Sequence, residues 1–275
     1  MFKSYLGSGA AKSGRTFPRG GFTLVELMIV VAIISILAAL LLPALSKGKI
    51  RAKQTSCMNN LKQQSVCWFM YTDDNQGFLA ESYFFDSTGR PNPNVWVRGS
   101  MDDHPAFAKL DAGVLDSTNL NTLVRGKFWH YNQAPGIYRC PSDKSHTAGV
   151  PRVRSYAMNG WMGGRPLAGQ DKFRVFLRES DITDPTPSRA WVFIDEHEKS
   201  INDGWFAVDM TGILGLLDAP ATRHDSKFAL AFADGHMENW KLLDNRSRMW
   251  TELPIQDNPV NVDWSRLQAA SSSRR

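Results

Sequence analysis

The residues Gly20-Gly21-Phe22-Thr23-Leu24-Val25-Glu26 lead into the long apolar run of the chain, around which the fold is organised. From Leu27 to Leu45 the sole polar side chain is Ser35. As a helix, residues 22–45 would span about 36 Å, enough to cross a hydrocarbon core of about 30 Å. The sequence therefore predicts one membrane-spanning helix, with residues 1–21 preceding it as a polar leader.

Two residues of this span are unusual for a membrane helix. Glu26 lies in its first turn, where an unpaired charge in lipid costs several kcal/mol, so it needs a partner or a shallow position. Pro43 lies near the other end, where it removes one helix hydrogen bond and should kink or loosen the helix. Both residues are candidates for a role in assembly.

Beyond Pro43 the pattern stays helical but has one apolar stripe. Ile50, Cys57, Leu61 and Trp68 recur at spacings of seven, four and seven, which predicts an amphipathic continuation of the helix over residues 46–77. The turn-forming run at 72–77 should end it. Such a stripe would lie against a globular domain.

Residues 78–270 should form that globular domain, because short apolar runs alternate with Gly, Pro, Asn and Asp. Ala190–Ile194 is typical of a buried strand. Phe228–Ala233 and Met237–Leu242 flank Asp234-Gly235 and predict a hairpin. We therefore expect an α+β fold, in which a long N-terminal helix packs on a β-rich antiparallel head, with a disordered tail at 271–275.

The charge distribution argues against a nucleic-acid-binding protein. Of the 32 basic residues, four lie in the first 21 positions, where there is no acid, and 28 then remain against 27 acidic residues. A phosphate-binding surface needs clustered basic residues, and here the excess lies in the leader. Gly-rich phosphate loops, nucleophile elbows and paired zinc cysteines are absent from the sequence, so we expect no enzyme.

The three cysteines allow at most one disulfide within the chain. If residues 57–67 are helical, Cys57 and Cys67 stand about 15 Å apart, at about 1.5 Å per residue. This exceeds the Cα separation of about 7 Å that a disulfide can span. Any bridge would therefore use Cys140, and the alternative is three ordinary buried thiols.

Gly21 followed by Phe-Thr-Leu-Val-Glu and an apolar helix resembles the processing site of type IV pilins and type II secretion pseudopilins. The resemblance implies cleavage after Gly21 by prepilin peptidase and N-methylation of Phe22. It also implies a single-pass inner-membrane protein with its N-terminus inside and its head in the periplasm. Glu26 would then pair with the Phe22 amine of a neighbouring subunit, because pairing removes the cost of a lone buried carboxylate.

A second resemblance covers the C-terminal part. His224 followed by Asp234-Gly235 matches the H-X9-DG pattern of large prepilin-like proteins, and the blocks 57–63 and 139–143 resemble other recurrent blocks of that group. This resemblance favours a disulfide between Cys57 and Cys140. It names no task for His224 or Asp234.

Two metal sites are conceivable from residue types alone. His224, Asp234 and His236 could suit zinc, but His224 lies ten residues from a tight turn, or about 30 Å along an extended strand. Calcium is the better candidate, because hard carboxylate oxygens crowd one loop; its members are Asp195, Glu196, Glu198 and Asp203. A solvated acidic loop is the ordinary alternative, and we expect no other cofactor.

The sequence thus predicts a structural subunit of a type II secretion pseudopilus, with other pseudopilins and an inner-membrane assembly platform as partners. One alternative is a major or minor type IV pilin for adhesion or motility, which would have the same leader and helix. Another is a membrane-anchored binding protein or enzyme that uses a prepilin signal.

Overall fold

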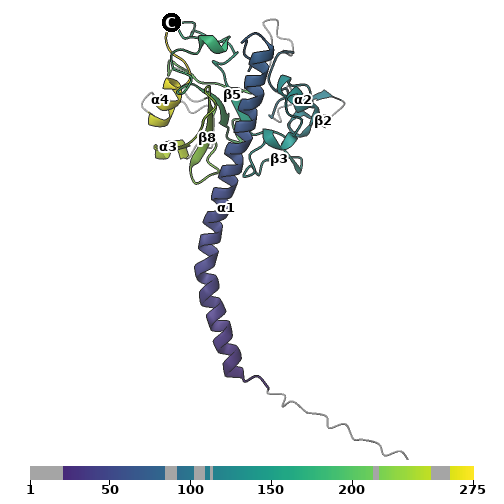
Figure 1. The fold of residues 1–275 in the computed structure, drawn as a ribbon, viewed down its shortest axis with the longest axis vertical. Coiled ribbons are helices and arrows are strands. Elements are labelled where there is room, and N and C mark those ends of the chain that lie inside the picture. The colour runs from purple at the N-terminus through teal and green to yellow at the C-terminus, as the bar shows by residue number, and fades with distance from the viewer. Residues whose placement is uncertain (1–20, 84–91, 102–108, 112–113, 213–216, 249–260) are drawn as a thin grey trace, which may run out of the picture. The chain divides into compact units, whose positions relative to one another are not determined.

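The computed structural model describes residues 21–83, 92–101, 109–111, 114–212, 217–248 and 261–275 (Figure 1). The chain divides into two compact units, Met1–Lys47 and Gly48–Arg275, and helix α1 (Leu24–Asp74) passes through both. Apart from Gly21, the expected leader lies outside the described residues.

Local hydrogen bonds define both ends of α1. At the start, Thr23 Oγ1 accepts from the Glu26 amide at 3.3 Å, and Glu26 Oε2 accepts from the Thr23 amide at 2.8 Å. This reciprocal pair is a capping box. At the end, the Gly77 amide donates to the Thr72 carbonyl at 2.7 Å, with Gly77 at a φ of +80° that glycine adopts without strain. The helix continues through Pro43.

A five-stranded sheet forms the centre of the second unit, in the order β7-β5-β6-β8-β9. Its strands are β5 (Tyr156–Asn159), β6 (Trp191–Asp195), β7 (Trp205–Phe206), β8 (Lys227–Phe232) and β9 (Met237–Lys241). The predicted buried strand is β6, and the predicted hairpin is β8–β9. The sheet is mixed rather than purely antiparallel, because edge strand β7 pairs parallel with β5.

The remaining elements are short. They are two two-stranded sheets, β1 (Lys109–Asp111) with β2 (Val114–Leu115) and β3 (His146–Thr147) with β4 (Val150–Pro151), and helices α2 (Asn121–Val124), α3 (Asn245–Arg248) and α4 (Val262–Ala269). Single 3-10 turns occur at η1 (Asp116–Thr118), η2 (Lys127–His130), η3 (Pro135–Tyr138) and η4 (Glu179–Asp181).

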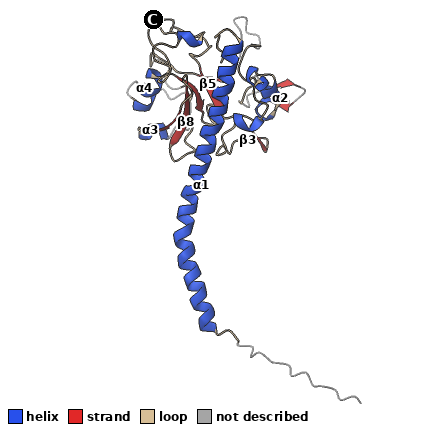
Figure 2. Ribbon diagram, viewed as in Figure 1, coloured by secondary structure: helices blue, strands red, loops and turns tan. Residues whose placement is uncertain are grey.

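The alternation of side chains along β8 explains how the sheet packs. Ala229 and Ala231 belong to the same buried cluster as Leu61 and Trp68 of α1. The large residues of β8 belong to a second cluster that contains Trp264 and Leu267 of α4; they are Phe228, Leu230 and Phe232. Successive residues of a strand face opposite sides of the sheet. The small side chains of β8 therefore pack against α1, and its large side chains pack against α4. Figure 2 shows β8 between these two helices.

The C-terminal tail differs from the prediction. Ser271 is fully buried: its hydroxyl accepts from Trp191 Nε1 at 2.8 Å and its carbonyl accepts from Asn159 Nδ2 at 3.2 Å. The Arg275 amide donates to the Lys172 carbonyl at 2.9 Å. A serine-rich composition predicts disorder, but these serines satisfy buried donors of the sheet and are held in place by them.

We therefore expect deletion of residues 271–275 to lower the free energy of unfolding by about 2–4 kcal/mol, because Trp191 and Asn159 would lose partners while staying buried. Urea unfolding of the full chain in detergent, followed by tryptophan fluorescence, measures this loss. Deletion of Arg275 alone is the control, since it spares the Ser271 contacts. Equal stability of both truncated chains and the full chain would contradict the packed tail.

Candidate functional site

The N-terminal unit presents an uncovered apolar helix. Its large apolar side chains from residue 22 to 45 are all exposed, with Phe22 at 75% and Leu40 at 71%. The helix is long and apolar enough to span a membrane by length and composition. A helix that is apolar on every side needs lipid or other apolar helices around it. At its first turn, Glu26 Oε2 also accepts from Thr23 Oγ1 at 2.7 Å.

The second unit contains a buried cluster of four side chains, Cys57, Cys140, Asp195 and His224. All four residues are fully buried, and their Sγ, carboxylate and ring nitrogen atoms lie within 4.8 Å of one another. His224 Nε2 lies 3.1 Å from Cys140 Sγ and 3.8 Å from Asp195 Oδ2, and Asp195 Oδ2 lies 3.5 Å from Cys57 Sγ. We call these residues the thiol cluster.

Four separate segments build the thiol cluster. Cys57 lies on the inward stripe of α1, and Asp195 is the last residue of β6. Cys140 follows η3, where its amide donates to Ser155 Oγ at 2.6 Å. His224 precedes β8, next to Asp225 at a φ of +58°. The cluster thus joins the helix to the sheet within the second unit.

Burial shifts the pKa values of Cys57, Asp195 and His224 in the direction that favours the neutral form of each side chain. The nearby Cys140 thiol and burial raise the pKa of Cys57 well above its ordinary value. Burial raises the pKa of Asp195 to about 6, although the Arg223 charge opposes this, and burial lowers the pKa of His224 to about 4. The Cys57 thiol is therefore protonated and the His224 imidazole neutral at neutral pH.

Arg223 provides the counter-charge beside the cluster. Its Nη1 donates to Asp195 Oδ1 at 2.5 Å, and its Nη2 donates to Glu198 Oε2 at 2.9 Å and to the Glu196 carbonyl at 3.0 Å. Asp195 therefore uses one oxygen for Arg223 and turns the other toward the thiols and His224. This division fixes the carboxylate orientation.

The structure brings Cys57 and Cys140 together, as the predicted pairing requires, but gives all three cysteines as free thiols. The disulfide therefore stays a prediction. Cys67 lies elsewhere on α1, where burial raises its pKa to about 11.

The predicted calcium residues do not meet at one point in the described structure. Asp195 belongs to the thiol cluster, and the half-buried Glu198 pairs with the buried guanidinium of Arg223. Glu196 is buried elsewhere, where its Oε1 accepts from Ser200 Oγ at 2.9 Å, and Asp203 Oδ1 accepts from the Trp205 amide at 2.8 Å. Neighbouring residues at the end of a strand point to opposite faces of the sheet. The positions of the acidic residues in the sequence do not show which face each one takes.

His224 and Asp234 are also separate. Asp234 Oδ1 accepts from the His236 amide at 3.1 Å in the β8–β9 turn, where Gly235 has a φ of +84°. Asp234 is thus a turn residue, as the sequence predicts, while His224 belongs to the thiol cluster. The sequence interpretation did not foresee that His224 lies beside the two cysteines, because it considered His224 as a metal ligand only together with Asp234 and His236. The signal was that Cys57, Cys140 and His224 each lie in one of the three recurrent blocks.

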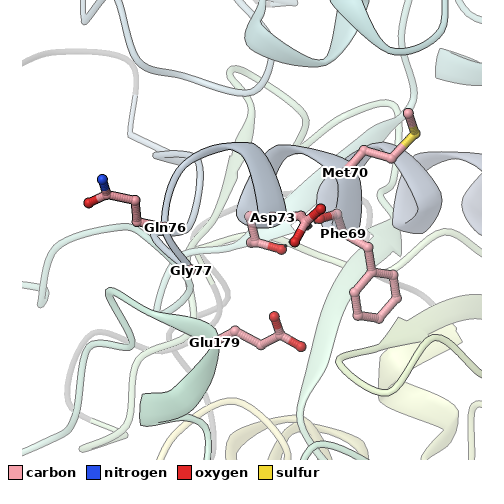
Figure 3. Close-up of a pocket in the computed structure, with 7 residues that line it drawn as sticks. Phe69, Met70, Asp73, Gln76, Gly77 and Glu179 are labelled. Carbon is pink, nitrogen blue, oxygen red and sulfur yellow. Dashed lines mark hydrogen bonds between the residues drawn. The ribbon is translucent and has the colours of Figure 1, made fainter.

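A surface pocket lies where α1 ends, with a volume of about 590 Å³. Phe69, Met70 and Asp73 line it from the helix, and Glu179 lines it from η4 (Figure 3). It mixes apolar and acidic side chains and is separate in its residues from the thiol cluster.

Comparison with known proteins finds one family motif and relatives that match about a quarter of the chain. Residues 17–42 match the family described as the prokaryotic N-terminal methylation motif. This N-terminal segment is of the prepilin type. Together with the apolar helix, the prepilin motif indicates a single-pass membrane-anchored protein.

Relatives of this chain include both secretion and pilus proteins. Type II secretion system core protein G of Pseudomonas aeruginosa is 35% identical over 83 residues, which are 28% of this chain and 58% of that protein. Type IV major pilin protein PilA of Myxococcus xanthus is 60% identical over 66 residues, 24% of this chain and 27% of that protein. Type IV wide pilus major component PilA4 of Thermus thermophilus is 41% identical over 69 residues, which are 25% of this chain and 53% of that protein.

The chain thus spans between about a quarter and three fifths of the length of these relatives. No solved structure matches it.

Proposed function

We propose that this chain is a structural subunit of a type II secretion pseudopilus. Prepilin peptidase would cut it after Gly21 and methylate Phe22, and an inner-membrane platform would then add it to a filament of pseudopilins. Residues 1–21 are the leader in this proposal, 22–45 the membrane and assembly helix, 46–77 its amphipathic continuation, and 78–270 the periplasmic head. The observation that carries the proposal is the prepilin motif directly before a helix whose apolar side chains are uncovered.

The physical argument links the motif to the helix. Cleavage at Gly21 would place a new ammonium group at Phe22, one turn from the Glu26 carboxylate. Between neighbouring subunits this pair would neutralise two charges that are costly in an apolar bundle. Membrane lipid covers the helix before assembly, and helices of other subunits would cover it afterwards. The role requires neither a catalytic group nor a nucleic-acid surface.

A type IV pilin is the second candidate, because the match to the Myxococcus major pilin is the highest in identity of the three relatives described. Deletion of the gene separates the two roles. Loss of secreted proteins with surface fibres intact supports the pseudopilus, whereas loss of fibres with secretion intact supports the pilus. A chain with enzymatic turnover in its head would contradict both.

The first experiment is N-terminal sequencing and intact-mass measurement on the protein from its native membrane. We expect a chain that starts at N-methylated Phe22. In Gly21→Val the bulkier side chain should hinder entry of an extended backbone into the peptidase, and the uncut precursor should accumulate. Gly20→Ala is the matched control and should be processed. A start at Met1 in the unmodified chain would refute prepilin processing.

A further inference from the structure

We propose that Cys57, Cys140, Asp195 and His224 bind one zinc ion that fastens helix α1 to the sheet. This inference concerns the second unit alone and does not depend on which filament the chain enters. It assigns a role to the histidine of the H-X9-DG pattern and to both cysteines of the recurrent blocks.

The ligand types suit zinc better than calcium. Two sulfurs, one imidazole nitrogen and one carboxylate oxygen form a borderline-soft set, whereas calcium takes six to eight oxygen ligands. Among the described residues, the thiol cluster is the one group of three or more such side chains whose ligand atoms lie this close together. Full burial of all four residues supplies a closed site, which is typical of structural rather than catalytic zinc.

The distances also fit a tetrahedral ion. Zinc bonds of about 2.0–2.3 Å, arranged tetrahedrally, place neighbouring ligand atoms about 3.3–3.8 Å apart. The separations of 3.1 Å between Cys140 Sγ and His224 Nε2, 3.5 Å between Cys57 Sγ and Asp195 Oδ2, and 3.8 Å between His224 Nε2 and Asp195 Oδ2 lie near this range. The remaining pairs of ligand atoms lie within 4.8 Å, so closing the site around an ion would take shifts of up to about 1 Å.

Zinc would neutralise most of the charge of its ligands. Zinc would displace the protons of the Cys57 and Cys140 thiols to solvent, so two thiolates, one carboxylate and a dication together carry one negative charge. Arg223 places a positive charge beside Asp195 Oδ1, and the same guanidinium also faces Glu198 at 2.9 Å and Asp143 at 3.8 Å. Tyr156 Oη, 3.3 Å from Cys57 Sγ, can donate to the thiolate. Such outer partners orient the ligands of zinc sites.

The test uses the full chain, purified in detergent under reducing conditions and washed with a weak chelator. Metal analysis should find one zinc ion per chain. Replacement by Co²⁺ should give the visible bands of tetrahedral cobalt and a sulfur-to-cobalt charge-transfer band. Cys140→Ser and His224→Ala should each lose most of the bound zinc. Cys67→Ser is the matched control, because it removes a buried thiol that lies outside the cluster, on the helix α1 that carries Cys57. This variant should keep its zinc.

Several outcomes would overturn the proposal. One is a folded, reduced wild-type chain that takes up neither zinc nor cobalt. Another is a Cys57–Cys140 disulfide in protein taken from its native membrane, shown by peptide mapping without reduction. Zinc that persists in Cys140→Ser would show adventitious binding. If that variant does not fold, the wild-type cobalt spectrum decides, since a spectrum without sulfur-to-cobalt bands contradicts the assignment.

Discussion

Glu26→Ala should leave the chain inserted in the membrane and cleaved, yet lower its incorporation into filaments by more than about tenfold. The reason rests on the proposed pairing of Glu26 with the Phe22 ammonium group of a neighbouring subunit. Leaving one charge of such a buried pair alone costs about 3–5 kcal/mol, and each 1.4 kcal/mol is tenfold in an equilibrium constant. Quantification of sheared filaments against total membrane protein measures the effect.

The capping box gives Glu26 a second, purely local role that the same experiment must separate. Glu26→Gln keeps a side-chain oxygen that can accept from the Thr23 amide but removes the charge. Thr23→Val does the reverse, because it removes the Oγ1 contact and keeps the carboxylate. We expect Glu26→Gln to fail in assembly and Thr23→Val to assemble. Normal filaments from Glu26→Gln would mean that Glu26 acts only as a helix cap, and would refute the charge pairing.

Gly163→Ala should lower the free energy of unfolding by about 3–5 kcal/mol. Gly163 has a φ of +63°, and a Cβ there would collide with the carbonyl oxygen of buried Ala80. Its amide donates to the Phe176 carbonyl at 2.8 Å, so the backbone cannot move away without breaking that bond. Urea unfolding of the full chain in detergent measures the loss.

Gly169→Ala is the matched control for this substitution. Gly169 has a similar φ of +75°, but nothing lies within 4 Å of the position that its Cβ would take. It should therefore show only the cost of a left-handed alanine, about 1–2 kcal/mol. The difference between the two variants isolates the collision with Ala80. Equal losses would mean that the segment around Ala80 yields and that close packing at Gly163 contributes nothing.

The elements that the sequence predicted well are those with local causes. The apolar run from Leu27 and the turn-forming run at 72–77 predicted helix α1, because helix formation depends on residues a few positions apart. The Thr23–Glu26 cap was seen only in the structure. The β8–β9 hairpin follows from alternation around Asp234-Gly235 in the same way. The prepilin motif likewise requires no tertiary structure to be found, since residues 17–42 are contiguous.

Only the tertiary structure decided what lies at long range. The sequence could not show that β7 pairs parallel with β5, or that buried Trp191 and Asn159 hold Ser271 in the tail. Sheet register and helix docking bring Cys57, Cys140, Asp195 and His224 together from four segments, and no periodicity within any one segment encodes such a meeting. Neighbouring residues alone were enough to find the long apolar helix and the prepilin motif, because both are properties of contiguous sequence. The thiol cluster depends on packing between distant residues.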